Sequence, residues 1–283
     1  MRLVAPTAFK STRSPMEAAR FLAEPGDRLL PLSDGGDGFL ECVQFAMGGR
    51  LEWRHAADPF GRTRPVPVAI LDDGTVVVEC AKVIGLAGLT TPDPLRASSR
   101  GLGELLAEFS LAPRLWIGLG GSATVDGGRD WPALQLPPTT VFCDVTTDVL
   151  DCAHVFGPQK GARPEDVVVL TERLAALSLP RGPHTGAAGG LGAKLQSLGA
   201  ELADGAQRML AIVRFDAMCR DCDAVITGEG RLDASSLEGK LPVIVARRAR
   251  ALGLRVLGRF SCPGEGWELA APLFDEVAFE VEG

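Results

Sequence analysis

Two glycine-rich turns, each directly after a short apolar run, constrain the fold of this chain most strongly. Residues 115–128 begin Leu-Trp-Ile and continue Gly-Leu-Gly-Gly-Ser-Ala-Thr, and residues 223–233 contain Ala-Val-Ile followed by Thr-Gly-Glu-Gly-Arg. Glycine permits backbone conformations in which N–H groups converge on an anion. At the strand ends of α/β proteins such turns hold phosphate groups. The pattern therefore predicts an α/β fold with a phosphate-binding site.

Composition narrows the class of protein. With 283 residues, 46% of them apolar, the chain can form one large or two moderate domains. A formal net charge of −7 argues against nucleic acid as a partner. No window approaches the ~20 apolar residues of a membrane span, and the amino terminus is typical of a first strand rather than of a signal peptide. We therefore expect a cytoplasmic protein with no membrane partner.

The seven cysteines are odd in number and scattered, which favours reduced thiols over a disulfide framework. Cys219 and Cys222 form a lone C-x-x-C motif, and the three histidines lie far from it in sequence. A zinc site needs a second pair of ligands. The motif therefore carries little support for a zinc or redox function.

The amino-terminal region predicts alternating strands and helices. Residues 2–5 and 28–32 are expected to be strands, and residues 39–47 a helix after the loop 33–38. Ser14 is placed to cap a helix that runs to about residue 23, with a proline next and a glutamate three positions on. This β-α-β-α order is the opening of a parallel sheet.

The centre of the chain follows a different pattern. Residues 66–71 and 75–80 flank Asp-Asp-Gly, which predicts an antiparallel hairpin. Further on, we expect a strand over 140–144 and helices over 165–177 and 188–198, then a strand over 223–227, a helix over 241–252 and a strand over 255–260. We predict a two-domain α/β protein with an interdomain cleft. Residues 1–55 and 201–283 would form a discontinuous parallel, flavodoxin- or Rossmann-like domain, and residues 56–200 an inserted mixed α/β domain.

Residues 118–123 also match the dinucleotide fingerprint G-x-G-x-x-A, and Asp144 follows at about the spacing of a ribose-binding acid. Ser122 and Thr124 crowd the place where the fingerprint's helix begins, and two glycines at 127 and 128 would end that helix early. An NAD-dependent dehydrogenase therefore remains an alternative, carried only by this match.

Acidic groups, lone lysines and glycine turns recur together at the predicted strand ends. Phosphoryl transfer needs backbone donors, cations to neutralise charge, carboxylates for Mg²⁺ and a base for the attacking hydroxyl. We assign catalysis to Lys10, Asp144, Lys160 and Asp233, with Asp144 activating the hydroxyl or holding Mg²⁺. The predicted substrate- and phosphate-binding residues are Asp34, Gly35, Gly36, Gly120, Gly121, Ser122, Thr124, Asp126, Gly228, Glu229, Gly230, Arg231 and Lys240.

Several stretches resemble the bacterial type 1 glycerate kinases and occur in that family's order. They are residues 31–38, 117–128, 142–145, 156–162, 186–192, 226–233 and 239–242. The resemblance implies two α/β domains facing across a cleft, and phosphorylation of D-glycerate by ATP and Mg²⁺ to give 2-phosphoglycerate. A monomer or a homodimer is compatible with it.

Some positions differ from the family pattern. The family's first loop reads Pro-Asp-Ser-Phe-Lys, and here Thr7 replaces the carboxylate while Lys10 remains. The family's Asn-Pro-Leu after Cys-Asp-Val is rewritten in residues 146–153. A catalytically impaired relative of the glycerate kinases is therefore a further alternative.

Overall fold

The computed structural model describes residues 1–9 and 12–279. The chain forms two compact units. The first unit comprises Met1–Asp34, Glu41–Ala46 and Ala206–Gly283, and the second comprises Gly35–Leu40 and Met47–Gly205. Both ends of the chain therefore contribute to one unit, and the middle of the chain forms the other. No helix among the described residues is long and apolar enough to cross a membrane.

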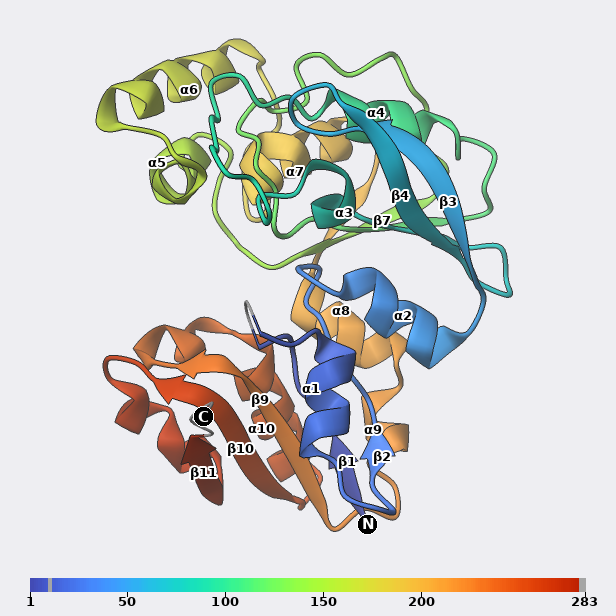
Figure 1. Cartoon of the computed structure of the whole chain (residues 1–283), viewed down its shortest axis with the longest axis vertical. Helices are drawn as coiled ribbons and strands as arrows, with labels where there is room; N and C mark the ends of the chain where they lie inside the picture. Colours follow the sequence, from blue (N-terminus) through green and yellow to red (C-terminus); the bar gives the residue numbers. More distant parts are fainter. Residues whose placement is uncertain (10–11, 280–283) are drawn as a thin grey trace. The chain divides into compact units, whose positions relative to one another are not determined.

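The first unit is built on a five-stranded sheet in the order β11-β10-β9-β1-β2 (Figure 1). Every neighbouring pair in this sheet is parallel. The strands are β1 (Arg2–Val4), β2 (Arg28–Leu29), β9 (Ala224–Leu232), β10 (Arg255–Pro263) and β11 (Glu276–Phe279). Val4 pairs with Ile226, so the first strand lies beside one that follows it by more than 200 residues. The parallel sheet predicted from the two chain ends is confirmed.

The helices of the first unit begin at recognisable signals. Ser14 caps α1 (Pro15–Leu22): its hydroxyl accepts a hydrogen bond from the Glu17 N–H, and the Glu17 carboxylate accepts one from the Ser14 N–H. This reciprocal cap satisfies two backbone donors that the helix itself cannot pair. The other helices are α8 (Gly205–Ile212), α9 (Phe215–Met218) and α10 (Leu241–Ala251), with 3₁₀ turns at Ala234–Glu238, Trp267–Leu269 and Ala271–Leu273.

The second unit contains a six-stranded mixed sheet in the order β3-β4-β5-β6-β7-β8. Its strands are β3 (Arg50–Ala57), β4 (Thr63–Ile70), β5 (Val76–Glu79), β6 (Leu115–Gly118), β7 (Thr139–Cys143) and β8 (Glu201–Asp204). The first two pairings are antiparallel and the rest are parallel. The predicted hairpin corresponds to β4 and β5. The edge strand β3 and the strand β8 were not predicted.

One apolar core joins the sheet of the second unit to its helices. It contains side chains from β4 to β7, from α4 and from α7, among them Val66, Val78, Leu105, Ile117, Val141 and Leu191. Burying one such side chain contributes about 1.5–3 kcal/mol. The helices are α3 (Cys80–Ile84), α4 (Arg100–Ala107), α5 (Cys152–Phe156), α6 (Pro164–Ala176) and α7 (Ala187–Ser197), with a 3₁₀ turn at Pro158–Lys160. The helix α2 (Phe39–Met47) has residues in both units.

Candidate active site

The glycine turn after β6 lies at the carboxyl edge of the parallel strands of the second unit. In the register of the sheet, Gly118 stands between Glu79 of β5 and Phe142 of β7. No helix follows this turn: residues 119–138 are irregular up to the start of β7, and Ser122 instead forms a bridge with Gly85. The dinucleotide fingerprint therefore lacks the helix N-terminus on which a Rossmann site depends. This absence removes the structural support for the dehydrogenase alternative.

A second glycine segment, Gly35–Gly38, packs directly on this turn. The Gly120 N–H donates a hydrogen bond to the Gly35 carbonyl at 2.8 Å. A Cβ on Gly120 would lie 2.4 Å from the Gly36 Cα, and a Cβ on Gly35 would lie 2.2 Å from the Phe142 carbonyl oxygen. Both distances are too short for any side chain, so the close backbone contact requires glycine at these positions.

Backbone donors are available at the outer part of the turn. No residue in the described ranges 1–9 and 12–279 accepts a hydrogen bond from the N–H of Gly121 or of Ser122. Gly121 has a left-handed conformation, with φ 71°, and is exposed. Successive unpaired N–H groups around a left-handed residue form a concavity that attracts anions. The turn is thus suited to a phosphate oxygen.

Lys160 supplies a positive charge beneath the turn. The residue is 4% exposed, and its ammonium donates to the Ser122 hydroxyl and to the Thr124 carbonyl, both at 2.9 Å. Burial lowers the pKa of Lys160, against the raising influence of nearby acidic groups that include Asp144. The Thr124 hydroxyl is buried and has no hydrogen-bond partner among the described residues. Lys160 therefore anchors the turn through the Ser122 hydroxyl and the Thr124 carbonyl.

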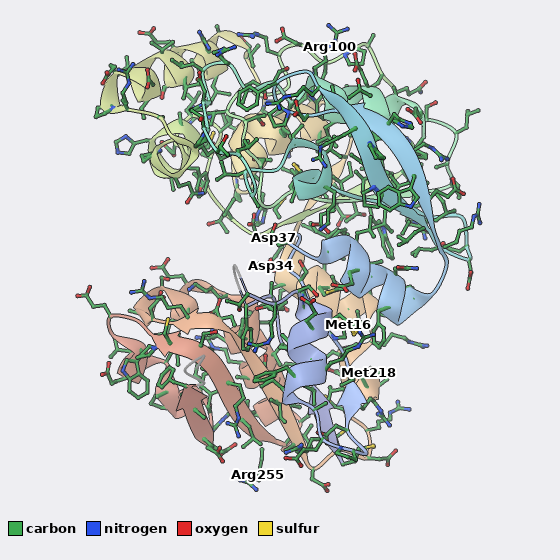
Figure 2. All side chains as sticks on the ribbon, viewed as in Figure 1. Met16, Asp34, Asp37, Arg100, Met218 and Arg255 are labelled. Atoms are coloured by element: carbon green, nitrogen blue, oxygen red, sulfur yellow. The ribbon has the colours of Figure 1, made fainter. Side chains whose placement is uncertain are left out.

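Two exposed carboxylates border the turn. A Cβ on Gly120 would lie 2.9 Å from an oxygen of Asp144, and a Cβ on Gly121 would lie 2.9 Å from an oxygen of Asp37. Figure 2 shows Asp37 at the loop that precedes α2. Asp144 is among the predicted site residues, whereas Asp37 is not, although Asp37 belongs to the same acidic glycine loop as Asp34. No group of three His, Cys, Asp or Glu side chains within the described ranges is arranged to hold a metal ion.

Carboxylates beside a turn with unpaired N–H groups are a type of ligand set that suits Mg²⁺. Mg²⁺ is commonly held by one or two carboxylates together with substrate phosphates and water. Asp144 and Asp37 would supply these carboxylates beside the turn after β6.

Asp126 occupies an internal position at the end of the same turn. One carboxylate oxygen accepts from the Ser99 N–H at 2.7 Å and from the Ser99 hydroxyl at 2.9 Å, and the Trp131 indole N–H donates to that hydroxyl. Burial raises the pKa of Asp126, although the two hydrogen bonds from Ser99 oppose the shift. The geometry favours a role in anchoring the turn to the start of α4 over direct contact with a ligand.

The strand end of β9 in the first unit gathers a second group of predicted residues. The Lys240 ammonium lies 3.3 Å from Asp233 and 3.8 Å from Glu229. The Ser236 hydroxyl donates to Glu229 at 3.2 Å, and the exposed Arg231 lies 3.8 Å from Asp233. The end of β9 thus carries a group of partly exposed charged side chains that pair with one another.

The structure sorts the predicted residues into two clusters. The second unit contains Gly35, Gly36, Gly120, Gly121, Ser122, Thr124, Asp126, Asp144 and Lys160. The first unit contains Asp34, Gly228, Glu229, Gly230, Arg231, Asp233 and Lys240. Lys10 falls outside the described residues. The prediction that all of them line one cleft remains a prediction.

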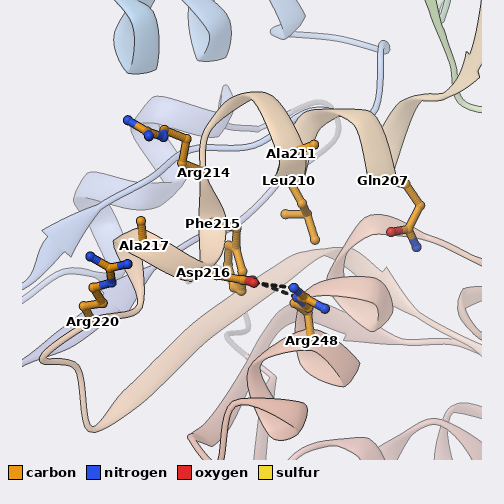
Figure 3. Close-up of a pocket in the computed structure, with 9 residues that line it drawn as sticks. All are labelled: Gln207, Leu210, Ala211, Arg214, Phe215, Asp216, Ala217, Arg220 and Arg248. Atoms are coloured by element: carbon orange, nitrogen blue, oxygen red, sulfur yellow. Dashed lines mark hydrogen bonds and ion pairs between the residues drawn. The ribbon is translucent and has the colours of Figure 1, made fainter.

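The first unit also contains a cavity of about 530 Å³ between α8, α9 and α10 (Figure 3). Its charged lining includes Arg214, Arg220 and Arg248, and the Arg248 guanidinium is paired with the Asp216 carboxylate. This guanidinium lowers the pKa of Asp216. None of the predicted site residues lines the cavity.

A parallel α/β architecture with glycine turns, acidic groups and lysines at its strand ends defines a class of phosphate-handling proteins. The sequence model of the glycerate kinase family matches residues 2–135 and 129–268. The chain belongs to the glycerate kinase family.

Individual relatives agree with this assignment. A glycerate 2-kinase of Escherichia coli K12 is 31% identical over 319 residues, which cover 90% of this chain and 84% of the relative. An uncharacterised protein of Mycobacterium tuberculosis is 36% identical over 297 residues, covering 90% of this chain and 77% of the relative. A crystal structure of a protein provisionally designated glycerate kinase 2, from Salmonella typhimurium LT2, aligns with a TM-score of 0.76 at 28% identity. It covers 98% of this chain and 89% of that one.

Proposed function

We propose that this protein transfers the γ-phosphoryl group of ATP to D-glycerate, giving 2-phosphoglycerate and ADP. The 2-hydroxyl oxygen attacks the γ-phosphorus, the bond to the bridging oxygen of ADP breaks, and the hydroxyl proton passes to a base. The observation that carries this proposal is the turn after β6, where the N–H groups of Gly121 and Ser122 have no acceptor among the described residues and the buried Lys160 ammonium contacts the Ser122 hydroxyl.

The turn would stabilise charge on the transferring phosphoryl group. Phosphoryl transfer depends mainly on positioning and on donors prearranged around the phosphate oxygens. Gly121 and Ser122 offer N–H donors, and Lys160 polarises the Ser122 hydroxyl that it contacts at 2.9 Å. We assign the carboxylate of D-glycerate to Lys10, and we propose that the cluster of Glu229, Asp233 and Lys240 serves the same reaction.

We propose two alternative roles for Asp144, and an experiment can distinguish them. It can accept the hydroxyl proton, or it can hold Mg²⁺, which when bound would neutralise charge on the nucleotide phosphates. A lost base lowers kcat at every Mg²⁺ concentration, whereas a lost ligand raises the Mg²⁺ concentration that half-saturates the reaction. An Asp144→Asn variant titrated with Mg²⁺ separates the two.

The test of the function is ADP release by the purified protein with D-glycerate and Mg-ATP, with the product identified by ³¹P NMR. We expect turnover with D-glycerate and much less with L-glycerate. Nucleotide binding without turnover would contradict the proposal and favour the catalytically impaired relative. Reduction of NAD with a hydroxy acid would favour the dehydrogenase.

A further inference from the structure

The Glu79 carboxylate is a buried acidic group that the proposed reaction does not yet use. Glu79 ends β5, beside Gly118 in the register of the sheet, and is 1% exposed. Burial raises the pKa of this carboxyl group, with the nearby Lys82 opposing the shift. Burying a carboxylate costs several kcal/mol unless hydrogen bonds compensate, so its partners indicate what it does.

Those partners are two backbone N–H groups about forty residues earlier in the chain. Gly38 donates to one carboxylate oxygen at 3.2 Å, and Leu40 donates to the other at 3.0 Å. The Lys82 ammonium lies 3.7 Å away on the exposed side. Glu79 therefore fixes the backbone between Gly35 and the first turn of α2.

The segment that Glu79 fixes is the one that packs on the phosphate-binding turn. Gly35 accepts the hydrogen bond from Gly120, Gly36 fills the space beside Gly120, and the Asp37 carboxylate borders Gly121. The other flank of the turn is held by the chain that follows α3, where the Leu86 N–H donates to the Gly121 carbonyl at 2.9 Å. The position of Gly121 thus depends on two segments, residues 35–37 before α2 and Leu86 after α3.

We propose that Glu79 is a positioning residue for phosphoryl transfer, which holds Gly35–Gly38 against the turn after β6 and thereby places Asp37 and the Gly121 N–H group. The inference rests on the proposed function. Glu79 touches no reacting atom, and it acts through the backbone that it binds. A role as helix cap alone would affect folding stability but not the rate constant of the folded enzyme.

The discriminating variant is Glu79→Gln, which keeps the size of the side chain but presents an amide NH₂ to one of the two N–H donors. We expect kcat to fall about 100-fold, as misplacement of catalytic groups by ~1 Å does, with a much smaller change in the KM for ATP. Unchanged kcat in a folded Glu79→Gln enzyme, with only the melting temperature lowered, would overturn the proposal. Absence of turnover in the wild type would instead refute the proposed function.

Asp58 provides a matched control in the same unit. Its carboxylate accepts from the N–H groups of Phe60 and Arg62 at 2.8 and 2.9 Å and has a cation 3.6 Å away, in the turn between β3 and β4. We expect Asp58→Asn to lower the melting temperature without changing kcat. Lys82→Met removes the partner cation while leaving both N–H bonds to Glu79, and we expect it to retain kcat.

Hydrogen exchange gives a readout that needs neither turnover nor a folded variant. In the wild type, a non-hydrolysable ATP analogue with Mg²⁺ is expected to slow amide exchange in the turn 118–124 and in residues 35–40 together. Slowing in the turn with no change in residues 35–40 would show that the two segments are not coupled, and would contradict the assignment of Glu79.

Discussion

The two glycine turns look alike in sequence but are organised differently. After β6, the turn is held by backbone contacts and by one buried cation, Lys160, while its carboxylate Asp126 is bonded inward. At the end of β9, charged side chains that are partly exposed pair with one another, as in Lys240 with Asp233 at 3.3 Å. The first arrangement is preorganised, whereas the second can rearrange because exposed ion pairs contribute little stability.

This difference has a functional consequence that mutations can test. Donors fixed in advance stabilise a transition state without reorganisation, so changes near the turn after β6 are expected to affect kcat most. The partly exposed charges at the end of β9 are better suited to binding, so changes there are expected to affect KM.

The largest effect is expected for Asp144→Asn. Loss of a general base or of a metal-binding carboxylate lowers kcat/KM by about 10³-fold. The measurement is steady-state ADP release over a range of Mg²⁺ concentrations, from limiting to saturating. Asp73→Asn, at an exposed ion pair with Arg114 in the same unit, is the control and should behave as wild type. Equal activity of the two variants at every Mg²⁺ concentration would remove Asp144 from the site.

Lys160→Met should reduce kcat about 100-fold, because the Ser122 hydroxyl loses its charged partner. Its effect on folding should be small: two hydrogen bonds are lost, but the cost of burying a charge is also removed. We expect the free energy of unfolding, measured in urea, to change by less than about 1 kcal/mol. A large loss of stability with normal kcat would make Lys160 a structural residue only.

Lys240→Met should raise the KM for substrate about tenfold and leave kcat nearly unchanged, since this charge is partly screened by solvent. Arg255→Met is a suitable control because Arg255 begins β10, at the opposite end of the parallel sheet from the β9 strand end (Figure 2). If kcat rather than KM changed in Lys240→Met, the contrast between the two turns would be wrong.

The smallest effect concerns the pH dependence of stability. Hydrogen bonds from Arg2 lower the pKa of Asp27, so Asp27 stabilises the fold above its unfolded pKa of about 3.9, and this contribution is lost as the pH falls through the lower folded pKa. Burial raises the pKa of Asp126, so its ionisation destabilises the fold as the pH rises from about 3.9 to the raised value.

Urea unfolding between pH 3 and pH 7 measures both contributions. Asp27→Asn should remove about 1 kcal/mol of stability at neutral pH and less in acid. Asp126→Asn should show the opposite trend with pH. Parallel curves for the two variants would contradict this difference between the units.

Local signals allowed much of the fold to be predicted. The cap at Ser14, the Asp-Asp-Gly hairpin and the apolar runs before both glycine turns each specify an element without reference to distant residues. β3 was missed although it alternates Leu51 and Trp53 with charged residues and is followed by a tight turn at residues 58–62. Both apolar side chains are exposed on this edge strand, so no buried apolar run marks it in the sequence.

The candidate site was predictable only in part, for a physical reason. Residue types at strand ends identified Asp144 and Lys160. The direction in which a carboxylate points is set by partners far along the chain, as for Asp126 with Ser99 and Glu79 with Gly38. Lys160 could be selected from its sequence, but its burial under Ser122 depends on a contact across 38 residues.

The most direct measurement is a crystal structure with Mg²⁺ and a non-hydrolysable ATP analogue. Phosphate oxygens within hydrogen-bond distance of the N–H groups of Gly121 and Ser122, with Asp144 near the metal, are the predicted result. A triphosphate bound elsewhere, leaving both N–H groups without a phosphate partner, would contradict the assignment of this turn to phosphoryl transfer.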